Sequence, residues 1–276
     1  MIDICTVVFE QELPALKVQA ESIARYASHL GTRNIYVVVN DSDDVVSKID
    51  ATWWGSLADR VMVVPRSSFS TDWSNNGWVS QQALKLLCSA MSYNQYVMVL
   101  DAKTIVVRDF ELAAVTDNGR PRVGTMAIFP VFQPSADIAG ALWDITVTQQ
   151  LGPGGVPYFF HTATVRAMIA DCEQRTKHSF PAWFQAQGML TEFVLYSAWL
   201  QQQNLYDTLY ADPAIIPCNV DHSEVNRIDA RLDEMQRIKP HTVSIHRGAW
   251  QHMTPDQRMR YQHYLIDQGL TSAWQL

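Results

Sequence analysis

The sequence has few charged residues, no paired cysteines and no long apolar run. Its four cysteines are far apart and form no Cys-x-x-Cys pair, which argues against a zinc knuckle and against a disulfide scaffold. No apolar run approaches the roughly 18 residues that a membrane helix needs. The first residues, Met-Ile-Asp, lack the basic segment of a secretory signal. We therefore expect a cytoplasmic protein with reduced thiols and no membrane span.

Basic charge is also scarce. The chain holds 21 Lys and Arg against 28 Asp and Glu, a formal net charge of -7. No overall positive field is therefore available to attract a polyanion such as nucleic acid. Apolar residues, in contrast, make up 47% of the 276 residues, and only 18% are charged. Such a chain can bury one large core, which favours one compact domain.

Strand-like and helix-like segments alternate in the first third of the chain. Residues 2–9, 35–39 and 61–64 are apolar and rich in β-branched side chains, while residues 13–30 and 77–91 have helical patterns. Strands that alternate with helices are typical of an α/β fold. The sequence therefore predicts a mainly parallel central sheet flanked by helices.

The most informative segment is residues 96–101, in which five mostly apolar residues end abruptly at Asp101. The pattern predicts a buried parallel strand that brings a carboxylate to the carboxyl edge of the sheet, where open α/β sheets bind ligands. A second apolar run, residues 105–107, follows too soon for a crossover helix, so the chain stays near the site. The alternative is an aspartate that only caps a turn.

The predicted helix 77–91 carries three polar or aromatic residues on one face. Trp78, Gln82 and Lys85 are spaced at i, i+4 and i+7. A right-handed crossover into the next strand would place the beginning of this helix near Asp101. A cation at that place suits a phosphate, and a solvated lysine is the alternative.

These motifs, in this order, resemble a nucleotide-sugar-dependent glycosyltransferase of the GT-A fold. More narrowly, they resemble an uncharacterised bacterial and phage branch, the DUF6492-like proteins. The segments that carry the likeness are Gly77-Trp78 with Gln82 and Lys85, Asp101-Ala-Lys-Thr104, 157–161, 191–196 and 244–247. The resemblance implies a single GT-A-like (Rossmann-like) domain, with a nucleotide-donor half at about 1–110 and an acceptor half with a closing segment at about 111–276.

The resemblance also implies an activity. A sugar would move from a nucleotide-diphosphate sugar, expected to be a UDP-sugar, to an acceptor hydroxyl on a glycan, a lipid-linked saccharide or a hydroxymethylated DNA base. The implied donor-binding residues are Trp78, Gln82, Lys85, Asp101, Lys103, His246 and Arg247. The alternatives are a nucleotidyltransferase of the same fold and a non-catalytic module that binds a sugar or a nucleotide.

Two further residues are expected at the acceptor. Glu192 begins a predicted helix, where a carboxylate is favourable without any chemistry. The resemblance implies that Glu192 is the general base for the acceptor hydroxyl and that Asp101 is the second catalytic residue, with Asp221 and Glu224 as reserves. His161 lies at a predicted junction of strand and helix, where it would contact the acceptor or cap the helix.

The sequence departs from the family at the metal motif. The resemblance implies Asp-x-Asp, which holds Mn²⁺ or Mg²⁺ on the donor diphosphate, but this chain has Asp101-Ala-Lys103. An ammonium weakens such a site, because these ions need several hard oxygen ligands. Either Asp101 and His246 hold the metal with other ligands, or Lys103 itself neutralises the diphosphate and no metal is used.

Overall fold

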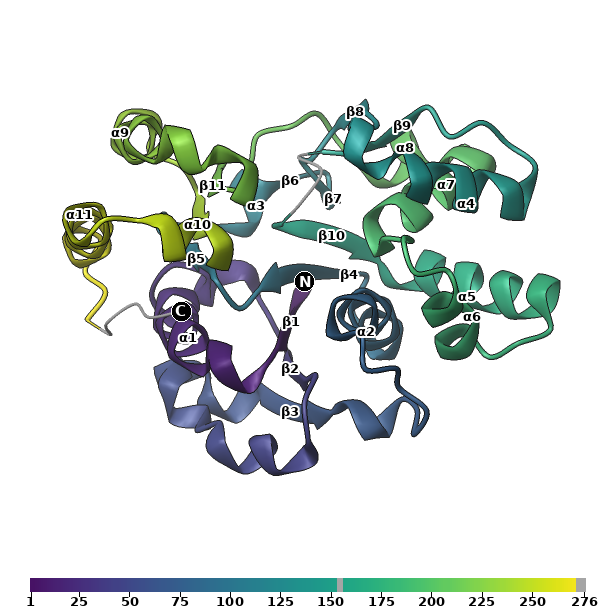
Figure 1. The fold of residues 1–276 in the computed structure, drawn as a ribbon, viewed down its shortest axis with the longest axis horizontal. Helices are drawn as coiled ribbons and strands as arrows, with labels where there is room; N and C mark the ends of the chain where they lie inside the picture. The colour runs from purple at the N-terminus through teal and green to yellow at the C-terminus, as the bar shows by residue number, and fades with distance from the viewer. Residues whose placement is uncertain (153–155, 272–276) are drawn as a thin grey trace.

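The computed structural model describes residues 1–152 and 156–271 (Figure 1). Its strands are β1 (Ile2–Val8), β2 (Ile35–Val39), β3 (Val61–Pro65), β4 (Tyr96–Asp101), β5 (Thr104–Val106), β6 (Thr116–Asp117), β7 (Arg120–Pro121), β8 (Thr125–Ala127), β9 (Gln149–Leu151), β10 (Tyr158–His161), β11 (Pro217–Val220) and β12 (Thr242–Ile245). Its α-helices are α1 (Leu13–Tyr26), α2 (Gly77–Met91), α3 (Leu112–Val115), α4 (Gln133–Trp143), α5 (Thr162–Thr176), α6 (Phe180–Ala186), α7 (Glu192–Gln203), α8 (Tyr206–Leu209), α9 (Ile228–Ile238), α10 (Arg247–His252) and α11 (Pro255–Asp267).

The central sheet has the strand order β10-β4-β1-β2-β3. Strands β4, β1, β2 and β3 run parallel, and β10 pairs antiparallel with β4. All seven residues of β1 and all five of β2 are buried. Such unbroken burial is typical of strands that are covered on both faces. The predicted fold class, a mainly parallel sheet flanked by helices, is confirmed.

Two crossovers fix where the sheet can bind a ligand. Helix α1 connects β1 to β2, and α2 connects β3 to β4, so the two connections run in opposite directions across the sheet. Right-handed crossovers in opposite directions place their helices on opposite faces, as Figure 1 shows for α1 and α2. The direction reverses between β1 and β4. The carboxyl ends of these two strands are therefore the topological switch point, where open α/β sheets bind ligands.

A smaller sheet, with the order β11-β12-β5, lies beside the end of β4. Strand β5 begins three residues after β4 ends, so the second sheet is tied to the carboxyl edge of the first. Strand β12 pairs antiparallel with β5 and parallel with β11. Helices α9, α10 and α11 gather at this side of the molecule (Figure 1). The C-terminal third therefore contributes side chains to the switch point.

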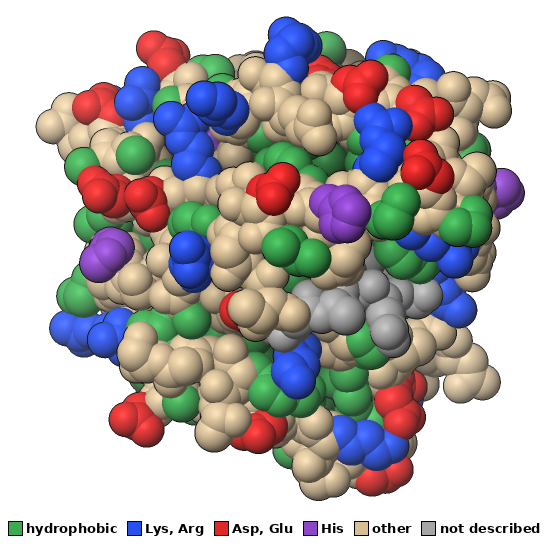
Figure 2. Space-filling view, turned by 90° about the vertical axis from the view of Figure 1, so that its left-hand side faces the viewer, with side chains coloured by type: hydrophobic (Ala, Val, Ile, Leu, Met, Phe, Trp, Pro, Cys, Tyr) green, Lys and Arg blue, Asp and Glu red, His purple; other side chains and the backbone are tan. Residues whose placement is uncertain are grey.

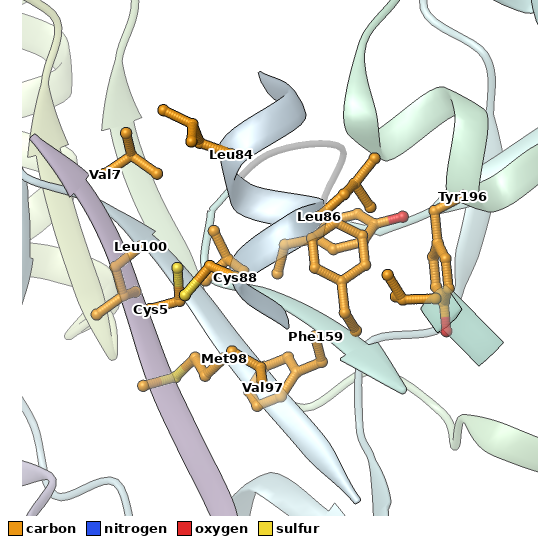
Figure 3. Packing of buried hydrophobic residues seen from close by; sticks show 14 of the residues in the cluster. Cys5, Val7, Leu84, Leu86, Cys88, Val97, Met98, Leu100, Phe159 and Tyr196 are labelled. Carbon is orange, nitrogen blue, oxygen red and sulfur yellow. The ribbon is translucent and has the colours of Figure 1, made fainter. Parts of the chain in front are cut away.

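Helix α2 packs against the central sheet through small and apolar side chains. Figure 3 shows Cys88 of α2 beside Cys5 of β1, with Leu84 and Leu86 on the same helix. All four cysteines of the chain are buried and free. Within the described residues, no helix is both long and apolar enough to cross a membrane.

The amino edge of the sheet is fixed by one buried carboxylate. Asp3 of β1 is 0% exposed. It accepts hydrogen bonds from the Asn34 backbone at 2.9 Å, from Ser92 Oγ at 2.7 Å and from Asn94 Nδ2 at 2.6 Å. These donors belong to the loops that lead into β2 and β4. Asp3 thus joins the starts of three neighbouring strands, β1, β2 and β4.

We expect Asp3→Ala to lower the free energy of unfolding by about 2–4 kcal/mol, because several buried donors lose a charged acceptor. Chemical denaturation monitored by circular dichroism measures the change. Asp109→Ala is the matched control, since Asp109 is exposed and its loss should change stability by less than about 0.5 kcal/mol. Equal stability of the two variants would contradict the structural role of Asp3.

Candidate active site

The centre of the candidate site is an ammonium group shared by two carboxylates. Lys85 Nζ of α2 lies 2.8 Å from Asp101 Oδ1 at the end of β4 and 2.9 Å from Glu192 Oε1 at the start of α7. The side chains of Lys85 and Glu192 are 3% and 0% exposed, and that of Asp101 is 18% exposed. Three elements from distant parts of the sequence therefore meet at one buried ion-pair cluster.

The pKa values of the three groups follow from this arrangement. Burial opposes the charged form of Asp101, yet the ammonium groups of Lys103 and Lys85 hold its pKa well below the usual range. Burial also opposes the charge on Lys85, but Asp101 and Glu192 raise its pKa. For Glu192 burial dominates and raises the pKa, with Lys85 opposing. Asp101 is consequently ionised at neutral pH.

Gln82 and Trp78 extend the cluster along α2 towards the surface. With its amide oriented to satisfy both ends, Gln82 donates to the Glu192 carboxylate and accepts from Trp78 Nε1 at 3.2 Å. Gln82 is buried, whereas Trp78 is 45% exposed. The predicted common face of Trp78, Gln82 and Lys85 is confirmed. Of the three, only Trp78 offers a surface to a ligand.

Lys103 lies in the turn between β4 and β5, with its Nζ 3.0 Å from Asp101 Oδ2. Gln19 of α1 holds the backbone of this turn. Its amide nitrogen donates to the Asp101 carbonyl at 2.6 Å and to the Thr104 carbonyl at 2.9 Å. The Gln19 side-chain oxygen accepts from Thr6 Oγ1 at 2.8 Å. Each polar end of Gln19 is thus satisfied, so the turn has little freedom to move Lys103.

Glu12, Asp221 and His246 interact electrostatically with Lys103 in this turn. We call these three side chains, together with Arg247, which follows His246 in the chain, the rim. Glu12 follows β1 and is half-buried, and the other three are exposed. Asp221 and His246 follow β11 and β12, which pair with Val220 opposite Ile245. The His246 backbone N–H donates to the Val220 carbonyl at 2.8 Å, which holds the two strand ends together.

Electrostatic effects couple the rim to Lys103. Burial raises the pKa of Glu12, and the Lys103 charge opposes this rise. Burial and then the neighbouring Glu224 carboxylate raise the pKa of Asp221, with His246 and Lys103 opposing. Partial burial of the ring and then the Lys103 ammonium lower the pKa of His246. Near pH 7 the imidazole is therefore neutral, and Lys103 is the cation that interacts with the Asp101, Glu12 and Asp221 carboxyl groups.

The side chains expected to hold Mn²⁺ or Mg²⁺ do not fit a divalent ion. Both oxygens of Asp101 already contact ammonium nitrogens, Oδ1 that of Lys85 and Oδ2 that of Lys103. His246 Nδ1 accepts the Gly248 N–H at 3.1 Å, so the neutral ring carries its proton on Nε2 and acts there as a donor. Within the described part of the chain, no three His, Cys, Asp or Glu side chains are arranged to hold a metal ion.

The structure brings most of the predicted residues to one place but changes what some of them can do. Gln82, Lys85 and Glu192 are buried and bonded to one another, so little of their surface is open to a ligand. A general base must lie within hydrogen-bonding reach of the proton it removes. The placement of Glu192 does not suit that role, and Lys85 does not suit a phosphate. Both hold Asp101 in position instead.

His161 lies away from the other predicted residues. It is the last residue of β10 and pairs with Tyr96, the first residue of β4. Because β10 is antiparallel to β4, its end lies at the amino edge of the sheet, about 16 Å along β4 from Asp101 at the usual rise per residue. His161 Nδ1 bonds to Thr164 Oγ1 at 2.7 Å, which is a local contact at the start of α5. The structure thus places His161 apart from the Asp101 cluster, and its contact with an acceptor stays a prediction.

Sequence reasoning missed two residues of the site. Gln19 is a polar residue on the buried face of α1, between Leu16 and Ile23, and a polar side chain on an apolar helix face is a detectable signal. Glu12 belongs to an acidic turn after β1, and the parallel pairing of Val7 with Asp101 brings that turn to the same edge. This pairing could not be read from the sequence alone.

The fold and the site define an α/β protein with a charged site at the switch point of a mainly parallel sheet. The chain belongs to a family of unknown function, DUF6492, whose model matches residues 4–225. Membership in this family, predicted from the order of motifs, is confirmed. No curated protein matches the chain in sequence.

Several solved structures are similar to this chain at low identity. The galactosyltransferase LgtC in complex with donor and acceptor sugar analogues is 11% identical over 94% of this chain and 100% of its own, with a TM-score of 0.49. Glycosyltransferase GlyE of Streptococcus pneumoniae TIGR4 is 12% identical over 98% and 60%, with a TM-score of 0.44. Mouse xyloside xylosyltransferase 1 is 11% identical over 88% and 97%, with a TM-score of 0.43. At these values the activity has to be argued from the residues of this chain.

The buried cluster predicts a stability effect. Lys85→Met leaves two buried carboxylates without Lys85, so we expect a loss of about 3–5 kcal/mol in the free energy of unfolding. Adding Glu192→Gln should recover part of this loss, because one of the two uncompensated charges is removed. Denaturant titration of both variants measures the difference.

The control for this cycle is Lys48→Met, since Lys48 forms an ion pair on the surface and should change stability by less than about 1 kcal/mol. The role of Lys85 would be contradicted if Lys85→Met were as stable as this control, or if the double variant were less stable than Lys85→Met alone.

Proposed function

We propose that this chain is a glycosyltransferase that moves a sugar from a uridine diphosphate sugar to a hydroxyl group of a glycan. The observation that carries the proposal is the convergence of Asp101, Lys103 and the rim at the switch point between β1 and β4. Ligands of open α/β sheets bind at such a point. The family resemblance implies the same class of reaction.

The donor diphosphate is assigned to the two accessible cations. Lys103 is 18% exposed and is fixed by Asp101, and Arg247 is exposed at the start of α10. A guanidinium matches two phosphate oxygens at once, while an ammonium acts as a point charge. The exposed indole of Trp78 at the start of α2 supplies a flat surface for the uracil or the sugar ring.

Asp221 is the group we assign as the general base in place of Glu192. Much of its surface is exposed and it follows β11 at the site; partial burial of the carboxyl group, and then the neighbouring Glu224, raise its pKa above the usual 3.8. A carboxylate with a raised pKa is a stronger base than an ordinary surface aspartate. Glu224, the other reserve, is engaged by Arg231, whose Nε lies 2.8 Å from Glu224 Oε1. Glu224 therefore serves as a neighbour of the base.

A glycan acceptor agrees better with the charge of the chain than a modified DNA base does. The formal net charge is -7, and a DNA backbone needs a basic surface to bind. Figure 2 shows the side of the molecule around α9 and α11, where basic and acidic side chains are interspersed. Several of these form ion pairs with each other, such as Arg260 with Asp229 and with Asp233. They neutralise this surface.

The direct test is a panel of nucleotide sugars, with and without simple glycan acceptors. We expect release of uridine diphosphate from a UDP-sugar, stimulated by the acceptor. Release of pyrophosphate would instead identify a nucleotidyltransferase, and binding without any release would identify a binding module. Arg247→Ala should raise KM for the donor by about ten- to a hundredfold with little change in kcat, because one charge-assisted contact is worth roughly 1.5–3 kcal/mol.

We expect Asp221→Asn to lower the rate of transfer by about 10² to 10⁴, the usual range for a lost general base, with donor affinity unchanged. Since the base acts only when it is deprotonated, the rate should fall as the pH falls through the raised pKa of Asp221. In the variant this acidic limb of the pH profile should disappear. Steady-state rates between pH 4 and pH 8 measure both effects.

Asp256→Asn is the matched control, because Asp256 is an exposed carboxylate of α11. It should leave both the rate and the pH profile unchanged. An Asp221→Asn variant that keeps the acidic limb would assign the base to another residue, with Glu12 as the next carboxylate to replace.

A further inference from the structure

Lys103 occupies an unusual position for a lysine near the surface. Its Nζ contacts Asp101 Oδ2 at 3.0 Å, and its side chain is only 18% exposed. The backbone on both sides of it is fixed, because Gln19 binds the carbonyls of Asp101 and Thr104. The ammonium is therefore held at the carboxyl edge of β4 rather than free to extend into solvent.

The pairing of the smaller sheet brings two potential metal ligands to the same edge. Thr104, next to Lys103, pairs with Ser244 of β12. His246 lies two residues further along that chain. Asp221 is adjacent to His246 through the pairing of β11 with β12 and the hydrogen bond from the His246 N–H to Val220.

Glu12 reaches this edge from the central sheet. Val7 of β1 pairs with Asp101, and the chain then turns into α1 with Glu12 as its N-cap. After burial, the charge of Lys103 has the largest effect on the pKa of both Glu12 and His246. Asp101 contacts the Lys103 ammonium directly, and the strand pairings bring Glu12, Asp221 and His246 to the same edge of the sheet. In the described part of the chain these side chains are not arranged as a metal site, although carboxylates and imidazoles are the groups that bind Mg²⁺ and Mn²⁺.

We infer that Lys103 is a built-in counter-ion, which occupies the place of a divalent cation at this edge and prevents such an ion from binding. A fixed ammonium repels a metal ion and takes the free oxygen of Asp101. The inference deepens the proposed function, since the same ammonium would neutralise the donor diphosphate. It concerns cation binding, however, and can be tested without any measurement of sugar transfer.

The test is a titration of purified protein with Mn²⁺, in which electron paramagnetic resonance measures the free ion. The natural protein should show no saturable binding below about 1 mM, the weak limit for protein sites of this kind. Lys103→Met removes the charge at similar volume and should bind Mn²⁺ at least tenfold more tightly. Lys103→Asp adds a second carboxylate and should bind more tightly still.

Lys17→Met and Lys17→Asp are the matched controls, because they change the net charge equally at an exposed position of α1. Both should bind Mn²⁺ no better than the natural protein. Adding Asp101→Asn to Lys103→Asp should abolish the new binding and so locate the ion. Circular dichroism checks that each variant is folded.

Three results would overturn the inference. If the natural protein bound Mn²⁺ as tightly as Lys103→Met, the ammonium would not block the ion. If folded Lys103→Met bound Mn²⁺ no better than Lys17→Met, there would be no cation-binding site at this edge. If the Mn²⁺ binding of Lys103→Asp persisted after Asp101→Asn was added, the ion would be bound elsewhere. The proposed transferase activity would stand or fall separately, on the release of uridine diphosphate.

Discussion

Lys85 brings one ammonium group to two carboxylates from different parts of the chain, Asp101 from β4 and Glu192 from α7. A buried ion pair adds little net stability, because removing its charges from water costs about as much as their attraction returns. Its effect here is geometric. An unpaired charge in this interior would be far less favourable, so α2, β4 and α7 are held in the one arrangement that keeps all three groups together.

This arrangement divides the site into an inner and an outer part. Glu192, Gln82 and Lys85 form the inner part, in which each polar group is satisfied by another. Asp101 belongs to both parts, because its Oδ1 contacts Lys85 and its Oδ2 contacts Lys103. The inner part therefore fixes the orientation of the Asp101 carboxylate. Through its contact with Asp101, the Lys103 ammonium is in turn held where a ligand would bind.

Local patterns in the sequence predicted much of the fold and part of the site. The apolar run before Asp101 and the spacing of Trp78, Gln82 and Lys85 depend only on neighbouring residues, and the structure agrees with both. Burial and strand direction depend on distant residues. Glu192 looked accessible at a helix start but is 0% exposed, and His161 lies at the opposite edge because β10 runs antiparallel. Neither property leaves a local pattern.

The lysine at position 103 and the lysine at position 85 are connected through the same carboxylate. A divalent ion needs oxygens whose negative charge is not already used. Asp101 gives one oxygen to Lys85, and among the described residues the other ion-pair partner of Lys85 is Glu192, whose pKa is raised by burial. A second carboxylate at position 103 would restore one ligand but not the oxygen that Lys85 holds. With Lys103 in place, each oxygen of Asp101 contacts one ammonium group, Oδ1 that of Lys85 and Oδ2 that of Lys103. Neither oxygen is then left with unshared negative charge for a divalent ion.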